Sequence, residues 1–400
     1  MRSRPDYIVT KDEVYGHANH WVGSALKLEY EGVKCNASTL LQVLLIAAAR
    51  VVSIFAAHRD LADAPCDQTI RNALAASLPE MPELERRLNL ALATELPKAL
   101  RRKARMIAVD LVLIPYHGQP LHCEKEIYRS APKSGTTHFH AYGTAFVVHK
   151  GHRYTLALTH VEQGEPLKDV VQRLLATVRR RGLRIKLVLL DKGFFSVAVI
   201  SYLKRARYGF IIPAVARGRK PKPPQRLTGL RAIKNKKNGY YRHTLTSNAG
   251  GRRRSSRLTI CAASKDYQHR KTGKHRRKKL LYAIWKVRLT PREIRETYRK
   301  RFGIETSYRQ MNEARIRTCT RDPRQRLLFA GIALVLRNVW VWLHFKLAKE
   351  KWSDEPRLFL ELLRFNGMLL WITQVIQRLL RADQKLGIDY ETYQRATAIN

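Results

Sequence analysis

Two aspartates stand out because each falls in an apolar run of the sequence. Asp110 lies in the middle of IAVDLVLI, and Asp191 ends LVLLD. Burying an unpaired carboxylate in such a run costs several kcal/mol, so we expect a cation or a metal ion beside Asp110. Asp191 ends a predicted strand, and open α/β sheets bind their ligands at the carboxyl ends of strands. The two aspartates together indicate a functional site more than two structural turns.

A third acid, Glu305, lies on a predicted helix that is otherwise rich in lysine and arginine. Around it, at spacings of three, four or seven residues, stand Tyr298, Arg301, Tyr308, Arg309 and Asn312. Side chains at these spacings share one face of a helix. A solvent-exposed stripe of ion pairs has the same spacing, and it is the presence of the two aspartates that favours the functional interpretation.

The elements that must position these residues begin with a helical region. Residues 39–58 are predicted to form one helix, buried nearly all round and capped by Asn36 or Ser38. Asp67 is predicted to cap a short second helix that presents polar side chains, namely Gln68, Thr69, Arg71 and Asn72. This layout suits a DNA-reading helix-turn-helix, and equally two packed helices of any α-domain.

From residue 105 the apolar pattern changes to that of a mixed sheet. Short apolar runs predict strands at 106–117, 138–149, 152–161, 184–191 and 209–215, with helices at 166–182 and 196–207. The order βββαβαβ is an antiparallel trio feeding a crossover into a mixed sheet. It is the strand order of the ribonuclease H-like fold.

Residues 217–290, the basic segment, contain 24 lysines and arginines against the single acid Asp266. The whole chain has a formal net charge of +44, and such an excess repels itself unless the protein works against a polyanion such as nucleic acid. Strand-like stretches at 257–264 and 279–289 separate its charged runs. The basic segment is therefore predicted to be a β-rich insertion.

Helices are predicted again at 290–314, 323–349 and 355–381. The predicted organisation is a helical DNA-binding region at 1–104, a first part of the core at 105–216, the insertion at 217–290, a catalytic helix at 291–320 and a helical region at 321–400. The fold class is thus an α/β ribonuclease H-like catalytic core with a basic β-rich insertion, flanked by N-terminal and C-terminal α-helical regions.

Cellular location is predicted from the cysteines and from two apolar stretches. The five cysteines are widely spaced without a CxxC pair, which favours reduced thiols in a cytoplasmic protein. The N-terminus lacks the apolar stretch of a secretory signal. Residues 327–345 reach the length of a membrane span, but Arg337, Asn338 and His344 within them favour a buried helix, so no membrane partner is expected.

The residues described above resemble the DDE transposases of prokaryotic insertion sequences. In one group of these enzymes the catalytic helix reads Y, two residues, R, three residues, E, six residues, K. Tyr298, Arg301 and Glu305 match this spacing, and Asn312 stands in place of the lysine. Around the second acid the pattern D-R-G-F is common in the group, and this sequence has Lys192 at the arginine position. The resemblance covers about residues 105–345.

This resemblance implies a reaction and a set of catalytic residues. Asp110, Asp191 and Glu305 would ligate two Mg²⁺ or Mn²⁺ ions, which stabilise the attacking and leaving oxygens of a phosphodiester. The enzyme would nick the terminal inverted repeats of its element and join the freed 3′-hydroxyls to target DNA. DNA contacts are expected from residues of the catalytic helix, the second-acid motif and the basic segment: Tyr298, Arg301, Arg309, Asn312, Lys192, Arg252, Arg253, Arg254, Arg276, Arg277, Lys278 and Lys279.

The expected partner is double-stranded DNA, bound by a homodimer because two ends must be paired, in a nucleoid-associated protein. The apolar helices at 39–58 or 323–349 are possible interfaces. Three alternatives stay open: a nuclease of the same fold that never joins DNA, a domesticated or inactive transposase that only binds DNA, and an RNA-binding protein, which would leave the three acids unexplained. A zinc site among His117, His122, Cys123, His138 and His140 is a weaker alternative.

Overall fold

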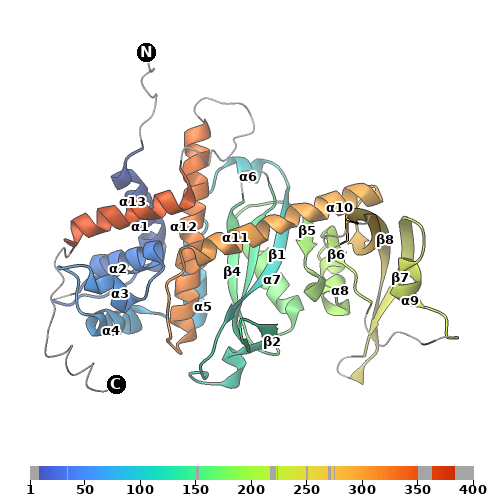
Figure 1. Cartoon of the computed structure of the whole chain (residues 1–400), viewed down its shortest axis with the longest axis horizontal. Helices are drawn as coiled ribbons and strands as arrows, with labels where there is room; N and C mark the ends of the chain where they lie inside the picture. The colour runs from blue at the N-terminus through green and yellow to red at the C-terminus, as the bar shows by residue number, and fades with distance from the viewer. Residues whose placement is uncertain are drawn as a thin grey trace, which may run out of the picture.

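The computed structural model describes residues 9–33, 35–149, 153–216, 222, 224–248, 251–268, 272–273, 275–349 and 363–382. A helical region and a large sheet stand side by side along the longest axis of the molecule (Figure 1). The helical region combines the N-terminal helices with the C-terminal helix α13, and β7, β8 and β9 lie at the opposite end.

The helices are α1 (Lys11–Leu26), α2 (Ala37–Arg50), α3 (Ile54–Arg59), α4 (Asp67–Ser77), α5 (Met81–Ala91), α6 (Ala99–Arg102), α7 (Leu167–Arg180), α8 (Val197–Arg205), α9 (Gly229–Lys234), α10 (Pro291–Arg299), α11 (Gly303–Asn312), α12 (Pro323–Lys349) and α13 (Phe365–Leu379). The strands are β1 (Arg105–Pro115), β2 (Tyr128–Lys133), β3 (Thr136–Val147), β4 (Thr155–Val161), β5 (Ile185–Leu190), β6 (Phe210–Pro213), β7 (Gly239–Ser247), β8 (Arg254–Gln268) and β9 (His275–Trp285).

The nine strands of the described residues form one sheet in the order β2-β3-β1-β5-β6-β9-β8-β7, with β4 also beside β3. Strand β1 pairs parallel to β5 and β5 parallel to β6, whereas the other pairs are antiparallel. The predicted βββαβαβ core is confirmed as a mixed sheet, but β2 and β7 were not predicted. β2 is a short, mostly exposed strand with a proline, and β7 alternates between half-buried and exposed residues, so neither has an apolar run.

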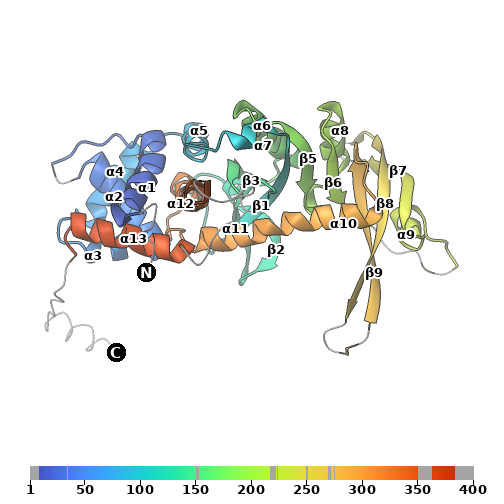
Figure 2. The ribbon, with the colours of Figure 1, turned by 90° about the horizontal axis from the view of Figure 1, so that it is seen from above.

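Helices cover both faces of this sheet (Figure 2). On one face, α7 packs so closely on β3 that a Cβ on Gly143 would come 2.9 Å from Val170, which explains the glycine there. On the other face, α10 and α11 cross the strands, and Ile294 and Tyr298 pack against Ala108 and Leu189. The side chains of β1 and β5 that point to this second face lie beneath α10 and α11.

The N-terminal helices differ from the prediction in two places. The helix expected at 39–58 ends at Arg50, because Val51 adopts a left-handed conformation with φ 56° and Ser53 caps the separate helix α3. Asn36 caps α2 as predicted. Asp67 is the first residue of α4 and not its cap, which is Cys66, and the Asp67 carboxylate instead pairs with Arg71 at 3.1 Å.

Side-chain amides close the free edge of β4. Asn89 of α5 both accepts from the Leu158 N–H and donates to its carbonyl, at 2.9 and 2.7 Å. Asn338 of α12 makes the same pair of bonds with Thr155, at 2.9 and 2.8 Å. Buried backbone groups at a sheet edge need such partners. The two asparagines therefore fix the helical region to the sheet.

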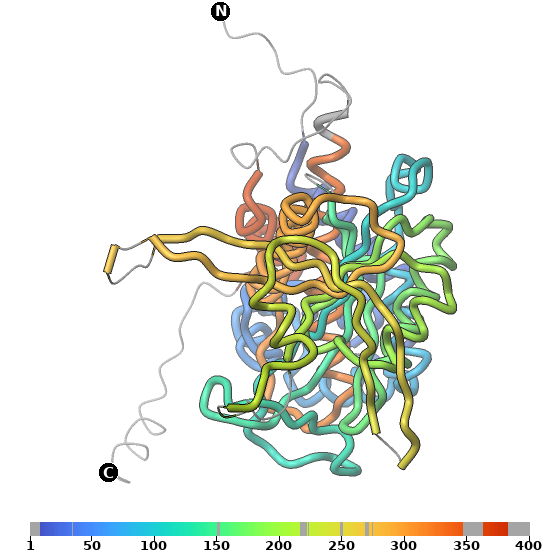
Figure 3. The backbone as a smooth tube through the Cα atoms, turned by 90° about the vertical axis from the view of Figure 1, so that its right-hand side faces the viewer, coloured from blue at the N-terminus to red at the C-terminus, as the bar shows by residue number. Residues whose placement is uncertain are grey.

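At the other end of the sheet, β8 and β9 continue beyond it as a two-stranded arm, defined here as residues 264–268 and 275–279. The arm projects on the side of the sheet that carries α10 and α11 (Figures 2 and 3). Its exposed positions include Arg276, Arg277 and Lys278. Both predicted strands of the basic segment are thus present: β8 is longer than expected, β9 begins and ends four residues earlier than expected, and α9 and β7 accompany them.

Helix α12 is the one helix of the described residues that is long and apolar enough to cross a membrane, and 94% of its most apolar window is buried inside the chain. Such burial is typical of a core helix of a folded domain. Most apolar residues of α2 are buried as well. Because both helices pack within the chain, neither offers the broad free apolar face that was considered as a dimer interface.

Candidate active site

Asp110 and Asp191 lie side by side on neighbouring parallel strands. The register pairs Val109 of β1 with Leu190 of β5, so the residue that follows each of them is one of the two aspartates. Asp110 shares its face of β1 with Ala108, and Asp191 shares its face of β5 with Leu189. Both aspartates therefore belong to the face that α10 and α11 cover.

Arg301 connects the two carboxylates. Its Nη2 lies 2.8 Å from Asp110 Oδ2 and 3.6 Å from Asp191 Oδ1, and the three side chains are 5%, 16% and 37% exposed. The guanidinium also lies over the ring of Tyr298, whose buried hydroxyl donates to the Leu190 carbonyl at 3.3 Å. The cation expected beside Asp110 is therefore an arginine of the chain itself.

The pKa of Asp110 is raised to about 6, because the effects of burial and of the negative charge of Asp191 together outweigh the lowering by Arg301. Desolvation outweighs the attraction because only one guanidinium nitrogen contacts the carboxylate at short range. Arg301 Nε is buried without a hydrogen-bond partner among the described residues. The centre formed by Asp110, Asp191 and Arg301 is thus incompletely satisfied, as functional sites often are.

The helix predicted at 290–314 is broken in the middle. Thr290 caps α10 with a capping box to Glu293 and Pro291 follows it, as the sequence predicts, but residues 300–302 form a 3₁₀ turn before α11 begins. The turn changes the helical phase. As a result the predicted single face divides: Tyr298 and Arg301 are buried toward the aspartates, while Glu305, Arg309 and Asn312 are exposed.

The side chain of Glu305 makes no hydrogen bond or ion pair with the part of the chain that the structure describes. Within those same residues, no three His, Cys, Asp or Glu side chains are gathered to hold a metal ion. The structure therefore brings together Asp110 and Asp191 but leaves Glu305 outside the centre. Its role as a third ligand stays a prediction, and it requires Glu305 to turn inward.

The donor chemistry of the centre suits a hard divalent cation. Carboxylate oxygens are the ligands that Mg²⁺ and Mn²⁺ prefer, and Asp110 and Asp191 offer them on adjacent strands, with one cation already attracted between them. Asp110 and Asp191 would hold such an ion, with Glu305 as the further candidate ligand. A bound ion would supply charge stabilisation at the oxygens of a phosphodiester.

Three further residues that position the centre were not predicted. The hydroxyls of Thr144 on β3 and Tyr308 on α11 lie 2.7 Å apart, and Thr144 is the register partner of Asp110. A Cβ on Gly303 would come 2.7 Å from the guanidinium of Arg153, so the Arg153 side chain packs closely against the start of α11. Thr144 and Arg153 lie far from Asp110 and Gly303 in the sequence, so only the folded structure shows that they are close to these residues.

The predicted DNA-contacting residues fall into two groups. Tyr298 and Arg301 are buried in the centre. The others are exposed or, for Lys279, half-buried, and they lie near the second acid, on α11, at the start of β8 and along β9: Lys192, Arg309, Asn312, Arg252, Arg253, Arg254, Arg276, Arg277, Lys278 and Lys279. Only the second group is accessible to DNA without rearrangement.

No zinc ligand set forms among the described residues. His138 instead contacts Arg129, and the rings of His140 and Tyr116 meet edge to face with centroids 4.7 Å apart. All five cysteines are free thiols, two of them buried.

Comparisons with known proteins concern the fold and the family of the chain. Among solved structures, the fold is similar to the piggyBac transposase in a synaptic complex with hairpin DNA, with a TM-score of 0.50, 13% sequence identity, and coverage of 97% of this chain and 82% of that chain. At this identity the likeness concerns the fold alone. No curated protein matches the sequence. Residues 101–339, which contain both aspartates, Arg301 and Glu305, match the family described as the transposase DDE domain. The predicted resemblance to DDE transposases is thereby confirmed, and the chain belongs to the transposase DDE domain family.

Proposed function

We propose that this protein is a DNA transposase of an insertion sequence, which nicks the terminal inverted repeats of its own element and joins the 3′-hydroxyls to target DNA. The observation that carries the proposal is the pair of aspartates on adjacent strands beneath the catalytic helix, within the segment that matches the transposase family. Asp110, Asp191 and Glu305 are proposed to hold two divalent ions, Mg²⁺ or Mn²⁺. This assignment follows the group with the Y-x2-R-x3-E-x6-K helix.

The basic segment supports a role in DNA binding. Its arm projects from the same face of the sheet as α10 and α11, so DNA held at the aspartates can also contact the arm (Figure 3). Salt-dependent contacts to phosphates by the exposed arginines and lysines would supply affinity without sequence preference. Helix α4 exposes Gln68, Arg71 and Asn72 and is proposed to read the inverted repeat. We place the protein in the cytoplasm, on the nucleoid, as a homodimer on DNA.

A plasmid assay tests this function. The purified full-length protein is incubated with a supercoiled plasmid carrying the DNA that flanks its gene, in Mg²⁺ or in EDTA. Nicks at two flanking boundaries followed by joined products are expected in Mg²⁺ only. Asp191→Asn should bind DNA but not cut it, while Asp169→Asn, a matched change at a half-buried aspartate paired with Lys168, should keep both activities.

The same assay separates the alternatives. Cuts without joined products would show a nuclease of the same fold. Salt-dependent binding with no cleavage in either Mg²⁺ or Mn²⁺ would show a protein that only binds DNA. Equal or tighter binding to RNA, without cleavage of DNA, would favour the RNA-binding alternative.

A further inference from the structure

Two arginines near the end of the catalytic helix form no ion pair with any carboxylate of the described residues. Arg315 lies in the connector between α11 and α12, and Arg326 lies in the first turns of α12. Burial lowers the pKa of both guanidinium groups, and the positive charges of Arg326 and Arg317 lower the pKa of Arg315 further. The groups that act in the opposite direction are tyrosines and a cysteine, with no aspartate or glutamate among them.

Both guanidiniums are held in place, with donors left over. Arg326 is 8% exposed, donates from Nε to the Thr320 carbonyl at 2.6 Å and lies 4.3 Å from the ring centre of Tyr116. Arg315 donates from Nε to Asn312 Oδ1 at 3.4 Å. The Nη groups of both arginines have no hydrogen-bond acceptor in the described part of the chain.

Two buried polar side chains of β3 adjoin these arginines. Tyr142 and His140 are 0% and 1% exposed, and neither the Tyr142 hydroxyl nor either ring nitrogen of His140 has a partner among the described residues. Arg326 acts electrostatically on both side chains. Burial, Arg326 and His160 lower the pKa of His140 to about 3, so at neutral pH its ring is uncharged and carries a single N–H donor.

Such an arrangement is unfavourable unless an anion completes it. The buried guanidinium of Arg326 repels the half-buried one of Arg315, and unpaired polar groups lose their hydration on burial. The planar donors of arginine match the oxygens of a phosphate group. We propose that Arg315 and Arg326, with Tyr142 and His140, bind a phosphate group, and that in the DNA complex this group is a backbone phosphate near the cleavage site.

The position of the site along the sheet supports a DNA phosphate, and this part of the inference rests on the proposed function. Thr144, Tyr142 and His140 point to one face of β3, and their register partners on β1 are Asp110, Val112 and Ile114. The site therefore lies two to four residues from Asp110 along the strands, which is roughly 7 to 13 Å. Because a DNA strand carries one phosphate per about 3.4 Å of helix axis, a strand cut at Asp110 would place a phosphate within a few nucleotides there.

The first experiment uses inorganic phosphate as the probe. Thermal unfolding of the full-length protein is measured in phosphate and in chloride at equal ionic strength, in EDTA. Arg315→Gln and Arg326→Gln are compared with Arg321→Gln, which removes the same charge from an exposed position of the same connector. Phosphate should raise the Tm of the wild-type protein and of Arg321→Gln, and this rise should be lost in the other two variants. An equal rise in all four proteins would overturn the site.

Arg326 also supports the connector through Thr320 and Tyr116, so its substitution could destabilise the fold by itself. Arg315→Gln is free of this complication and decides the outcome if Arg326→Gln does not fold. Arg326→Lys, which keeps the charge but not the planar fork, should bind phosphate more weakly than the wild type.

The second experiment measures binding to a DNA duplex in EDTA over a range of salt concentrations. Arg315→Gln should reduce the slope of log K against log salt by about 0.9, the value for one phosphate contact, relative to Arg321→Gln. Loss of the phosphate effect with unchanged slopes would overturn the DNA assignment and leave a site for free phosphate. If the plasmid assay shows no cleavage but the phosphate effect depends on Arg315, the proposed function fails while the phosphate site stands.

Discussion

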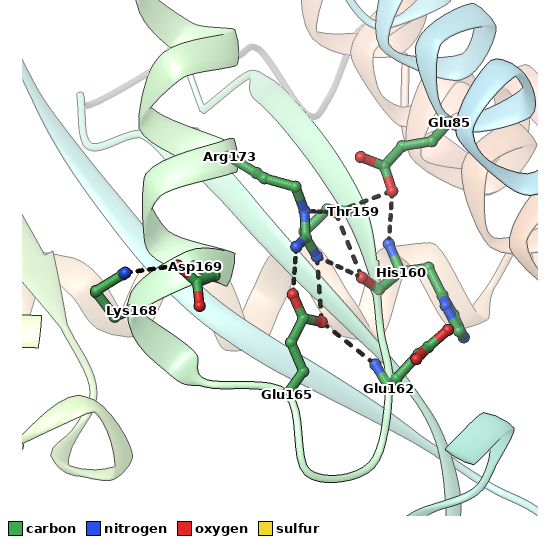
Figure 4. Close-up of polar contacts among 8 residues, drawn as sticks. All are labelled: Glu85, Thr159, His160, Glu162, Glu165, Lys168, Asp169 and Arg173. Carbon is green, nitrogen blue, oxygen red and sulfur yellow. Dashed lines mark hydrogen bonds and ion pairs between the residues drawn. The ribbon is translucent and has the colours of Figure 1, made fainter. Parts of the chain in front are cut away.

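Two clusters in this molecule each combine a partly or fully buried arginine with two carboxylates, and they differ in how completely they are bonded. In the first cluster, Arg173 of α7 contacts both oxygens of Glu165, donates from Nε to Thr159 Oγ1 at 3.0 Å and donates from Nη2 to the His160 carbonyl at 3.0 Å (Figure 4). Glu85 of α5 accepts from the Thr159 hydroxyl and from the His160 N–H, at 2.9 and 3.0 Å. Every nitrogen of Arg173 is used.

In the second cluster, Arg301 has one short contact to Asp110, a longer one to Asp191 and an Nε without a partner. The first cluster joins α5, β4 and α7, so its bonds hold the helical region on the sheet. The second lies beneath a broken helix, where a further cation has carboxylate oxygens to bind. The comparison teaches that composition alone does not separate a structural ion cluster from a functional one, whereas the completeness of its bonding does.

The largest effect is expected from a substitution in the second cluster, formed by Asp110, Asp191 and Arg301. Asp191→Asn should slow metal-dependent nicking by about a thousandfold or more, because an ion that stabilises the reacting oxygens contributes several kcal/mol. DNA binding in EDTA should be unchanged. The measurement is the initial rate of plasmid nicking, with Asp169→Asn as the control. Retention of more than a tenth of the wild-type rate would remove Asp191 from the centre.

A substitution in the first cluster, formed by Arg173, Glu165 and Glu85, should instead reduce the stability of the fold. Arg173→Gln removes the ion pair to Glu165 and the bonds to Thr159 and the His160 carbonyl, and the free energy of unfolding should fall by about 2 to 3 kcal/mol. Urea denaturation measures the loss, and the nicking rate per folded molecule should be preserved. A stable Arg173→Gln protein that no longer cuts DNA would reverse the roles assigned to the two clusters.

A pH effect of about 1 kcal/mol should distinguish the centre from ordinary surface carboxyls. The pKa of Asp110 is raised from 3.8 to about 6, so between these values the folded state binds more protons than the unfolded state. The contribution of Asp110 to stability therefore falls as pH rises through this interval. Between pH 7 and pH 5 the wild type should gain about 1 kcal/mol relative to Asp110→Asn, measured by urea denaturation at both values. A difference that does not change with pH, or changes with the opposite sign, would contradict the raised pKa.

The smallest effect on stability is expected next to the first cluster. Lys168 and Asp169 form a half-buried ion pair at 2.9 Å beside Arg173 (Figure 4). Lys168→Gln should change the free energy of unfolding by less than about 0.5 kcal/mol, because water and salt still screen a pair whose side chains are 33% and 41% exposed. A loss comparable to that of Arg173→Gln would show that the cluster extends to the surface.

The sequence predicted the parts of this molecule that depend on local pattern. Apolar strands with one aspartate each, the capping box before α10 and the density of charge in the basic segment are all visible without a structure. The break at residues 300–302 was not predicted, since the residues on either side have helical spacing and the contacts near the break, such as that of Arg153 with Gly303, come from a distant segment.

The bonding of the two clusters was equally outside the reach of sequence. Arg301 was expected to contact DNA, and its contact with Asp110 depends on how α10 lies across β1 and β5. Glu85 and Arg173 are separated by 88 residues and meet only through β4. Sequence patterns identify candidate side chains, but tertiary contacts decide which of them are left with capacity to bind a ligand.

The most direct test of the central claim maps the metal site in the protein itself. Fe²⁺ with ascorbate replaces Mg²⁺ in the full-length protein bound to a DNA duplex. The hydroxyl radicals formed at the bound ion cut the protein backbone near the ion. The account predicts fragments ending near Asp110, Asp191 and Glu305, suppressed by excess Mg²⁺ and absent in Asp191→Asn, with none near Glu85 or Arg173. Cuts that avoid the two aspartates, or that persist unchanged in excess Mg²⁺, would contradict it.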